Sequence, residues 1–138
     1  MEAENCDAGY VRVHYEYVNS LKEFFTRKAK VRHTISFSEL FSLFDEKIKK
    51  PDIYQTMEFG CGEIAPREIA IYEALLAKKS DGLPGSGFFD IFRNRRSEDY
   101  RQIAPAMPYP NRLSLEEQQA ITLIERERVY EHAAKLNK

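Results

Sequence analysis

The most regular hydrophobic pattern begins at residue 37. Apolar side chains recur there at the i, i+3, i+4, i+7 spacing of an amphipathic helix, at Phe37, Leu40, Phe41, Phe44 and Ile48. Ser36 and Glu39 have the spacing of a capping box, in which each side chain binds a free amide of the first turn. Lysines gather at residues 47–50, where the helix dipole favours cations. We therefore predict a helix that begins after Ser36 and ends before Pro51.

The first hydrophobic run allows two interpretations. Alternating apolar residues are typical of a half-buried strand and occur at Val11, Val13, Tyr15 and Tyr17. A face at helical spacing is also present, at Tyr10, Val13, Tyr17, Leu21, Phe24 and Phe25. Asp7 is placed to cap such a helix. We favour a helix over residues 9–29, less regular in its first half, followed by a short β-branched strand at residues 31–35.

The pattern between residues 52 and 82 is weaker. Residues 52–64 contain Gly60-Cys61-Gly62, which is typical of a turn. Pro66 suits the first position of a helix, because its missing N–H is not needed there. We predict that this helix buries one apolar side and that Gly82 ends it in a left-handed conformation.

Residues 88–103 are again ambiguous. Aromatic runs flank the basic segment 93–96, and Asn94 and Ser97 are turn-forming residues, which favours two strands around a basic hairpin tip. A single helix would also gather apolar side chains on one face, but that face would include the polar residues Arg95 and Asp99. We favour the hairpin.

The C-terminal region begins with prolines. Three of them in residues 104–110 predict an extended connector over residues 104–113. Ser114 and Glu117 then form a second capping box, which predicts a C-terminal helix within residues 114–138. Its narrow apolar stripe consists of Ala120, Leu123, Ile124, Tyr130 and Ala134. This stripe could pack on the core of the same chain or on a second copy in a homodimer.

Composition excludes several classes of protein. Of the 138 residues, 43% are hydrophobic and 31% are charged, which suits a single folded domain better than a disordered chain. No apolar run approaches the roughly 18 residues of a membrane-spanning helix. The acidic N-terminus does not resemble a secretory signal, and the two cysteines, Cys6 and Cys61, are too few for a disulfide scaffold. We expect a cytoplasmic protein that does not associate with membranes, with a flexible N-terminus at residues 1–8.

Charge is unevenly distributed although the net charge is −1. Residues 20–50 carry eight basic and four acidic side chains. Segregated charge of this kind can attract an anion even when the total is near zero. The basic side chains of this segment, among them Lys28, Lys30 and Arg32, are therefore candidate contacts to phosphate.

The order helix, short strand, two helices and basic hairpin resembles a winged-helix arrangement over residues 9–103. We therefore predict a mainly helical α+β fold of this kind with an added C-terminal helix. The resemblance implies that the protein binds double-stranded DNA, with the hairpin touching the backbone. Guanidinium groups suit such a position because they bind phosphate bidentately. The predicted DNA contacts are Arg93, Arg95, Arg96, Arg101, Lys28, Lys30 and Arg32.

A protein-interaction module is the alternative hypothesis. The chain contains 8 Tyr and 9 Phe, and aromatic residues and Arg are enriched at interface centres. A near-neutral net charge also fits a protein partner better than DNA. The tyrosines near predicted loops or helix edges are the candidate partner contacts: Tyr54, Tyr100, Tyr109 and Tyr130. Such a protein would act as an inhibitor, adaptor or subunit.

No motif for catalysis, metal binding or cofactor binding emerges. The candidate soft ligands Cys6, His14, His33 and Cys61 lack the short spacings of metal sites. Residues 85–87, Gly-Ser-Gly, do not form the G-x-S-x-G elbow of a nucleophilic serine, nor do the loop glycines form a P-loop. Carboxylates such as Glu58 cannot be paired from the sequence alone. We therefore predict a non-enzymatic DNA-binding or regulatory protein without a metal or cofactor.

Overall fold

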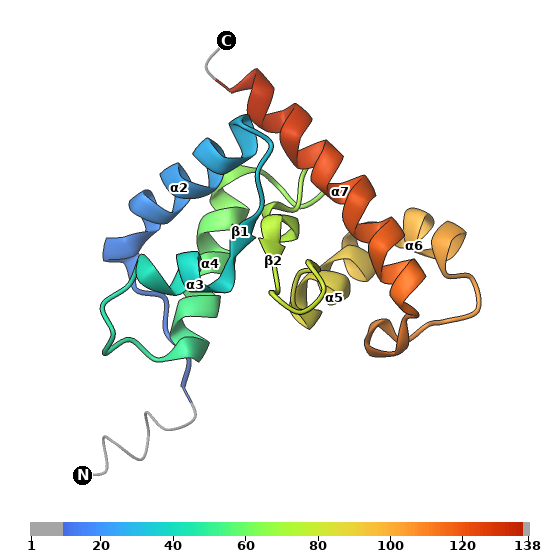
Figure 1. The fold of residues 1–138 in the computed structure, drawn as a ribbon, viewed down its shortest axis with the longest axis horizontal. Helices are drawn as coiled ribbons and strands as arrows, with labels where there is room; N and C mark the ends of the chain where they lie inside the picture. The colour runs from blue at the N-terminus through green and yellow to red at the C-terminus, as the bar shows by residue number, and fades with distance from the viewer. Residues whose placement is uncertain (1–9, 137–138) are drawn as a thin grey trace.

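The computed structural model describes residues 10–136 and shows a mainly helical α+β fold, as predicted (Figure 1). The predicted flexible segment 1–8 lies outside the described residues. In chain order the elements are η1 (Tyr15–Tyr17), α2 (Val18–Lys30), β1 (Ile35–Ser36), α3 (Phe37–Ser42), α4 (Lys50–Ile64), η2 (Tyr72–Leu75), β2 (Leu76–Ala77), α5 (Ser86–Arg95), α6 (Ser97–Ile103), η3 (Pro110–Arg112) and α7 (Leu115–Lys135). None of these helices is both long and apolar enough to cross a membrane.

Two apolar clusters form the interior, and α7 runs past both of them (Figure 1). The first cluster is built mainly from α2, α3, α4 and η2 and includes Val129 and Ala133 of α7. The second is built mainly from α5, with Tyr100 of α6 and Ile71 and Ala74 at η2, and it includes Ile121 from the first half of α7. The C-terminal helix therefore packs on its own chain and connects the two halves of the molecule.

The N-terminal segment is extended before it becomes helical. Residues 10–14 have no helical structure, because the amide of Arg12 donates to Asp52 Oδ1 (3.1 Å) and that of His14 donates to Thr56 Oγ1 (2.9 Å). These contacts tie the segment along α4. The predicted helix over residues 9–29 is thus wrong in its first half and correct from η1 and α2 onward.

The capping box of Ser36 is confirmed, but the helix behind it is short. Both hydrogen bonds between Ser36 and Glu39 are present, and α3 ends at Ser42. Asp45 forms a turn by accepting the amide of Lys47 on its own side chain (2.9 Å), which competes with helical hydrogen bonding. Pro51 then lies in the first turn of α4, so it starts a helix rather than ending one.

The glycines of residues 60–62 lie inside α4, so the predicted turn is wrong. A Cβ added at Gly60 would lie 2.7 Å from Leu21 Cδ2, and this shows how closely α2 and α4 approach each other. The loss of helix propensity at glycine is offset by this close packing.

The helix predicted after Pro66 does not form. This segment instead contains η2 and β2, and Leu76 and Ala77 pair in parallel with Ile35 and Ser36. The predicted strand at residues 31–35 is confirmed only at Ile35. Gly82 does adopt the predicted left-handed conformation, with φ of 73°.

The hairpin predicted at residues 88–103 is wrong, and so is the alternative single helix. Two helices, α5 and α6, meet at Arg96, whose φ and ψ of −128° and 49° interrupt them. Phe88, Phe92 and Tyr100 are all buried in the second apolar cluster. Phe88 and Phe92 are four residues apart, so a helix places both on the face that is buried. Since the two-stranded parallel sheet is the only sheet in the described part of the chain, the winged-helix arrangement is not confirmed.

The C-terminal capping box and helix are confirmed, but the buried face of α7 differs from the predicted stripe. The predicted extended connector over residues 104–113 is interrupted by η3, which begins at Pro110, and Ser114 and Glu117 then cap α7 as predicted. Leu123 is 67% exposed and Ile124 is 39% exposed. The buried residues of α7 are Ile121, Thr122, Glu125, Val129 and Ala133. The buried face therefore differs from the predicted one. The prediction missed it because this face includes Glu125, and a search for apolar residues does not count a carboxylate.

Candidate functional site

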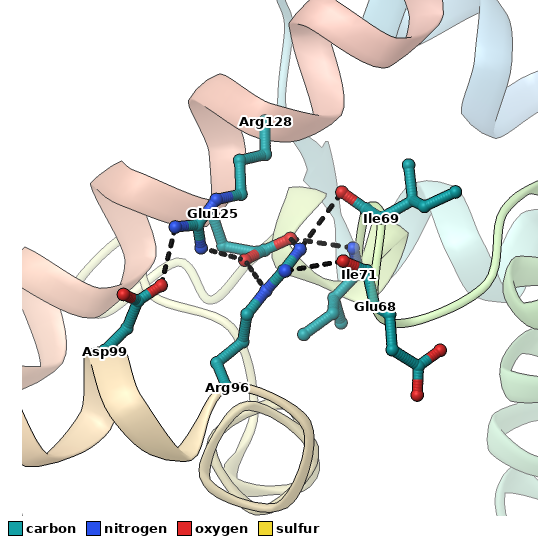
Figure 2. Close-up of polar contacts among 7 residues, drawn as sticks. All are labelled: Glu68, Ile69, Ile71, Arg96, Asp99, Glu125 and Arg128. Atoms are coloured by element: carbon teal, nitrogen blue, oxygen red, sulfur yellow. Dashed lines mark hydrogen bonds and ion pairs between the residues drawn. The ribbon is translucent and has the colours of Figure 1, made fainter.

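Arg96, predicted to contact DNA, is bonded inside the molecule (Figure 2). Its Nε and Nη2 donate to the two carboxylate oxygens of Glu125, each at 3.1 Å. Its remaining donors meet the backbone carbonyl oxygens of Glu68 (2.6 Å) and Ile69 (3.0 Å). With its side chain only 13% exposed, Arg96 joins the start of α6 to α7 and to the loop before η2.

The carboxylate of Glu125 is the centre of this buried network. It is fully buried, and besides Arg96 it accepts the amide of Ile71 (2.9 Å) and Arg128 Nη1 (3.0 Å). Arg128 also donates to Asp99 of α6 at 2.6 Å (Figure 2). Arg96 and Arg128 therefore share one buried carboxylate, and the network serves the architecture of the fold.

The other arginines of this segment do not form one outward tip. Arg95 pairs with Glu68 (2.7 Å), and Arg101 pairs with Glu98 (3.2 Å), both at the surface. Arg93 forms no ion pair with the described residues, and it lines a cavity of about 520 Å³ together with Arg101. Arg93 and Arg101 therefore line one cavity. Arg95 and Arg96 both donate to Glu68, through its side chain and its backbone carbonyl respectively.

The predicted basic contacts on and after α2 are partly neutralised. Lys28 donates to Glu39 at 2.8 Å, and Arg32 pairs with Glu127 while its guanidinium lies 4.8 Å from the ring centre of Tyr130. Lys30 is exposed and has no ion pair among the described residues.

The predicted partner contacts lie in four different environments. Tyr100 is buried, and its hydroxyl donates to the carbonyl of Met107 at 2.6 Å. Tyr130 is half-buried beneath Arg32, whereas Tyr109 is 60% exposed. Tyr54 is half-buried and lines a cleft.

This cleft has a volume of about 320 Å³ and is the best-formed candidate site. Its walls come from α3 and α4, on one side of the small sheet, and from the start of α5 on the other side (Figure 1). The lining residues are Phe37, Tyr54, Met57, Glu58, Glu73, Leu76, Gly85, Ser86, Gly87, Phe88 and Ile91. Most are apolar, and the only charged ones are two glutamates.

Glu73 is the buried polar residue of the cleft. Its side chain is 3% exposed and forms an ion pair with Arg67, while Oε1 has no hydrogen-bond partner within the described residues. Arg67 also donates to the carbonyl of Glu58 at 3.0 Å. Burial raises the pKa of the Glu73 carboxyl, and the positive charge of Arg67 opposes this rise.

The first turn of α5 forms the opposite wall. Gly85 is the N-cap residue, and the first amides of a helix have no partner within it. A Cβ added at Gly87 would lie 3.8 Å from Glu58 Oε2, in ordinary contact, so the glycine leaves space between the helix and this carboxylate.

The lining of the cleft contains one serine, Ser86, but no histidine or cysteine. Cys61 is buried, and burial raises the pKa of its thiol, which disfavours the reactive thiolate. No group of three metal-ligating side chains occurs in the described part of the chain. The arrangement is suited to binding.

Sequence reasoning treated the parts of this cleft separately. Glu58 had no assigned partner, and residues 85–87 were interpreted as loop chemistry. One signal was available, because Glu73 is the single charged residue within the apolar run 69–76. A lone carboxylate in such a run is a candidate for burial with a polar partner.

No family model, curated protein or solved structure matches this chain. The functional proposal therefore depends on the geometry of the site.

Proposed function

We propose that this protein is a non-enzymatic binding module that holds a small, largely apolar organic molecule in the cleft between α4 and α5. The observation that carries this proposal is a cavity of about 320 Å³ with mostly apolar walls and two carboxylates. Ligand sites typically have volumes of about 300–1,000 Å³ and a few polar groups in an apolar lining.

The position of the cleft suits a regulatory role. Met57 belongs to the first apolar cluster and Phe88 to the second, and both line the cleft. A ligand held between them would contact both halves of the molecule. Since a ligand stabilises the state that binds it, occupancy would strengthen the association of the two halves.

The test uses 2-phenylethanol as a neutral probe. We expect saturable shifts of the amide resonances of Gly85 and Gly87 in the wild type. Gly87→Phe should abolish them, because its side chain starts from a Cβ position that is free of close contacts and faces the cleft. Ala134→Phe, at an exposed position on α7, is the matched control and should bind like the wild type. Absence of saturable binding to the wild type, or equal binding to folded Gly87→Phe, would reject the proposal.

DNA binding is a second candidate, favoured by one observation. Arg93 and Arg101 line the same cavity of about 520 Å³, and Arg93 has no ion pair within the described residues. If they bind phosphate, Arg93→Ala with Arg101→Ala should weaken retention on heparin and reduce the salt dependence of duplex binding. Binding of a protein partner stays a prediction, with Tyr109 as its most exposed tyrosine candidate.

A further inference from the structure

We infer that a second site, formed where the extended residues 10–14 meet the loop before α4, binds the phosphate group of a small molecule. It is a cavity of about 220 Å³, and its lining residues are Tyr10, Arg12, His14, Lys47, Ile48, Lys49 and Asp52. None of these residues lines the cleft between α4 and α5, so this site is independent of the proposed function. The inference is carried by the convergence of three cations, by their lack of paired carboxylates in the described part of the chain, and by the size of the space.

Three cationic side chains converge on this cavity from two distant parts of the chain. Arg12 comes from the extended segment, whereas Lys47 and Lys49 come from the loop between α3 and α4. Ile48, between the two lysines, packs against the first apolar cluster and thereby fixes the course of the loop. The fold therefore brings like charges together, and like charges repel one another unless an anion lies between them.

Backbone hydrogen bonds anchor both parts of the site. The amide of Arg12 donates to Asp52 Oδ1 at 3.1 Å, which ties the extended segment to the first turn of α4. The amide of Lys47 donates to Asp45 Oδ1 at 2.9 Å, which fixes the turn beside the cavity. The three cationic side chains therefore start from fixed backbone positions before a ligand arrives, and such preorganisation lowers the entropic cost of binding.

The carboxylate in the lining already has partners of its own. Oδ2 of Asp52 is bonded to Nε2 of His14 at 2.9 Å, and Oδ1 accepts the amide of Arg12. The hydrogen bond with His14, and after it the one with the Arg12 amide, holds the pKa of Asp52 below its ordinary value. Within residues 10–136, Arg12, Lys47 and Lys49 form no ion pair. Three cations and one carboxylate leave an excess of positive charge, which an anion would balance.

The chemistry of the cations and the size of the space favour a phosphate group over other anions. A guanidinium binds phosphate through two parallel hydrogen bonds, and a lysine ammonium binds it as a point charge. A dianion is attracted to three cations more strongly than a monoanion such as a carboxylate. The volume of about 220 Å³ is below that of drug-sized pockets, so it suits a phosphate group with a small body. The exposed ring of Tyr10 in the lining provides apolar surface for that body.

The experiment compares phenyl phosphate with phenyl sulfate, which have similar shapes but carry about two and one negative charges at neutral pH. Dissociation constants come from titrations at constant ionic strength, followed by the amide resonances of Lys47 and Lys49. In the wild type, we expect saturable binding of phenyl phosphate, about fivefold tighter than that of phenyl sulfate, because the additional charge interacts with the three cations. Benzyl alcohol, which has no charge, should not shift these resonances.

Single substitutions distinguish a site from the general field of the protein. Lys49→Gln and Arg12→Gln should each weaken the binding of phenyl phosphate about fivefold, since each removes one cation from the lining. Lys50→Gln is the matched control, because it removes the same charge one residue along the chain. Lys50 is not in the lining, and its Nζ lies 4.9 Å from the ring centre of Phe41, so we expect a change of less than about twofold. All three side chains are exposed, so the variants should fold.

Several outcomes would overturn the inference. Equal losses in Lys49→Gln and Lys50→Gln would show attraction to the overall positive field and not binding at a site. Equal affinity for phenyl phosphate and phenyl sulfate, or no saturable binding of either, would also reject the phosphate site. Tighter binding of a random DNA duplex, weakened by the same substitutions, would assign these cations to a nucleic-acid backbone instead of a small molecule. None of these results affects the proposed function, because 2-phenylethanol binding is followed at Gly85 and Gly87.

Discussion

The two halves of this molecule are held together by different forces. The first half joins α2 to α4 by apolar packing so close that Gly60 has no room for a methyl group beside Leu21. The second half joins α6 and the loop before η2 to α7 through Glu125, a fully buried carboxylate bonded to two arginines and one amide. Apolar packing tolerates gradual change, whereas a buried ionic network fails when one member is removed.

The candidate site lies where these two kinds of packing meet. The cleft is at the boundary between the halves, and a second pair of buried charges, Arg67 and Glu73, lies beside it. The two ionic groups differ in one respect. Every carboxylate oxygen of Glu125 has a donor, whereas Oε1 of Glu73 and Nε of Arg67 are both buried without a hydrogen-bond partner within the described residues. The hydrogen bonding of the pair beside the cleft is therefore less complete than that of the network around Glu125.

The largest effect should come from removing the centre of the network. Glu125→Ala leaves Arg96 and Arg128 without their shared carboxylate, and we expect it to lower the free energy of unfolding by about 4 kcal/mol. Urea denaturation followed by circular dichroism measures this loss. Hydrogen exchange should increase more in α5 and α6 than in α2 and α4, because the network joins α6 to α7.

Glu127→Ala is the matched control for this variant. Glu127 lies two residues away on α7 and pairs with Arg32 at the surface, so its removal should cost less than about 1 kcal/mol. Similar losses for Glu125→Ala and Glu127→Ala would contradict the contrast between the two halves.

A smaller loss should follow from weakening the apolar half. Leu21→Ala removes a fully buried side chain between α2 and α4, and we expect a loss of about 3 kcal/mol in the free energy of unfolding. The accelerated hydrogen exchange should now be concentrated in α2 and α4. Faster exchange mainly in α5 and α6 would show that the halves do not respond separately.

The boundary between the halves should respond to pH. Burial raises the pKa of Glu73, which is faced by Arg67, by Glu58 and by the buried thiol of Cys61. Because the pKa of Glu73 is higher in the folded chain than in the unfolded chain, its contribution to the free energy of unfolding is fully present below the unfolded pKa and is lost as the pH rises through the raised pKa. Urea denaturation of the wild type and of Glu73→Gln over a range of pH measures this loss.

Glu73→Gln is the control for this pH titration, because it removes the titrating carboxyl and should lack this part of the pH dependence. An identical pH dependence of stability in the wild type and in Glu73→Gln would argue against a raised pKa of Glu73.

The smallest effect should come from the exposed apolar side of α7. Leu123→Gln changes a side chain that is 67% exposed, and we expect a stability change within about 0.5 kcal/mol. Ile121→Gln, two residues earlier and fully buried, should be strongly destabilising. Sedimentation of the Leu123 variant also tests the predicted homodimer, since a change in mass would show that this stripe forms an interface.

Local signals were the most reliable part of the sequence. Both capping boxes, at Ser36 and Ser114, occur as predicted, because each depends on residues only three positions apart. The left-handed conformation of Gly82 is correct for the same reason. Where a helix ends was less predictable. The apolar spacing that continues to Ile48 did not extend α3, since the turn at Asp45 interrupts it.

The sequence predicts only single residues of the candidate site and not the cleft that they form together. Tyr54 is a predicted contact residue and does line the cleft, whereas the pairing of Glu73 with Arg67 and the closeness of Glu58 to Gly87 appear only in the folded chain. For the arginines the error was the reverse, because residues predicted to act together are separated in the structure. Arg93, Arg95 and Arg96 lie within four residues of each other, yet Arg93 is exposed, Arg95 is paired at the surface and Arg96 is mostly buried in an ion pair with Glu125.

The sequence by itself determined the two capped helix starts, after Ser36 and Ser114, and the mainly helical character of the chain, because these depend on hydrogen bonds and dihedral preferences of neighbouring residues. Only the tertiary structure decided which face of α7 is buried and whether residues 88–103 form strands or helices. The tertiary structure also decided which charged side chains are buried in ion pairs and which are exposed. These outcomes depend on partners such as Glu125 and Arg96, which are 29 positions apart, and a charge is stable in the interior only when the fold brings its partner to it.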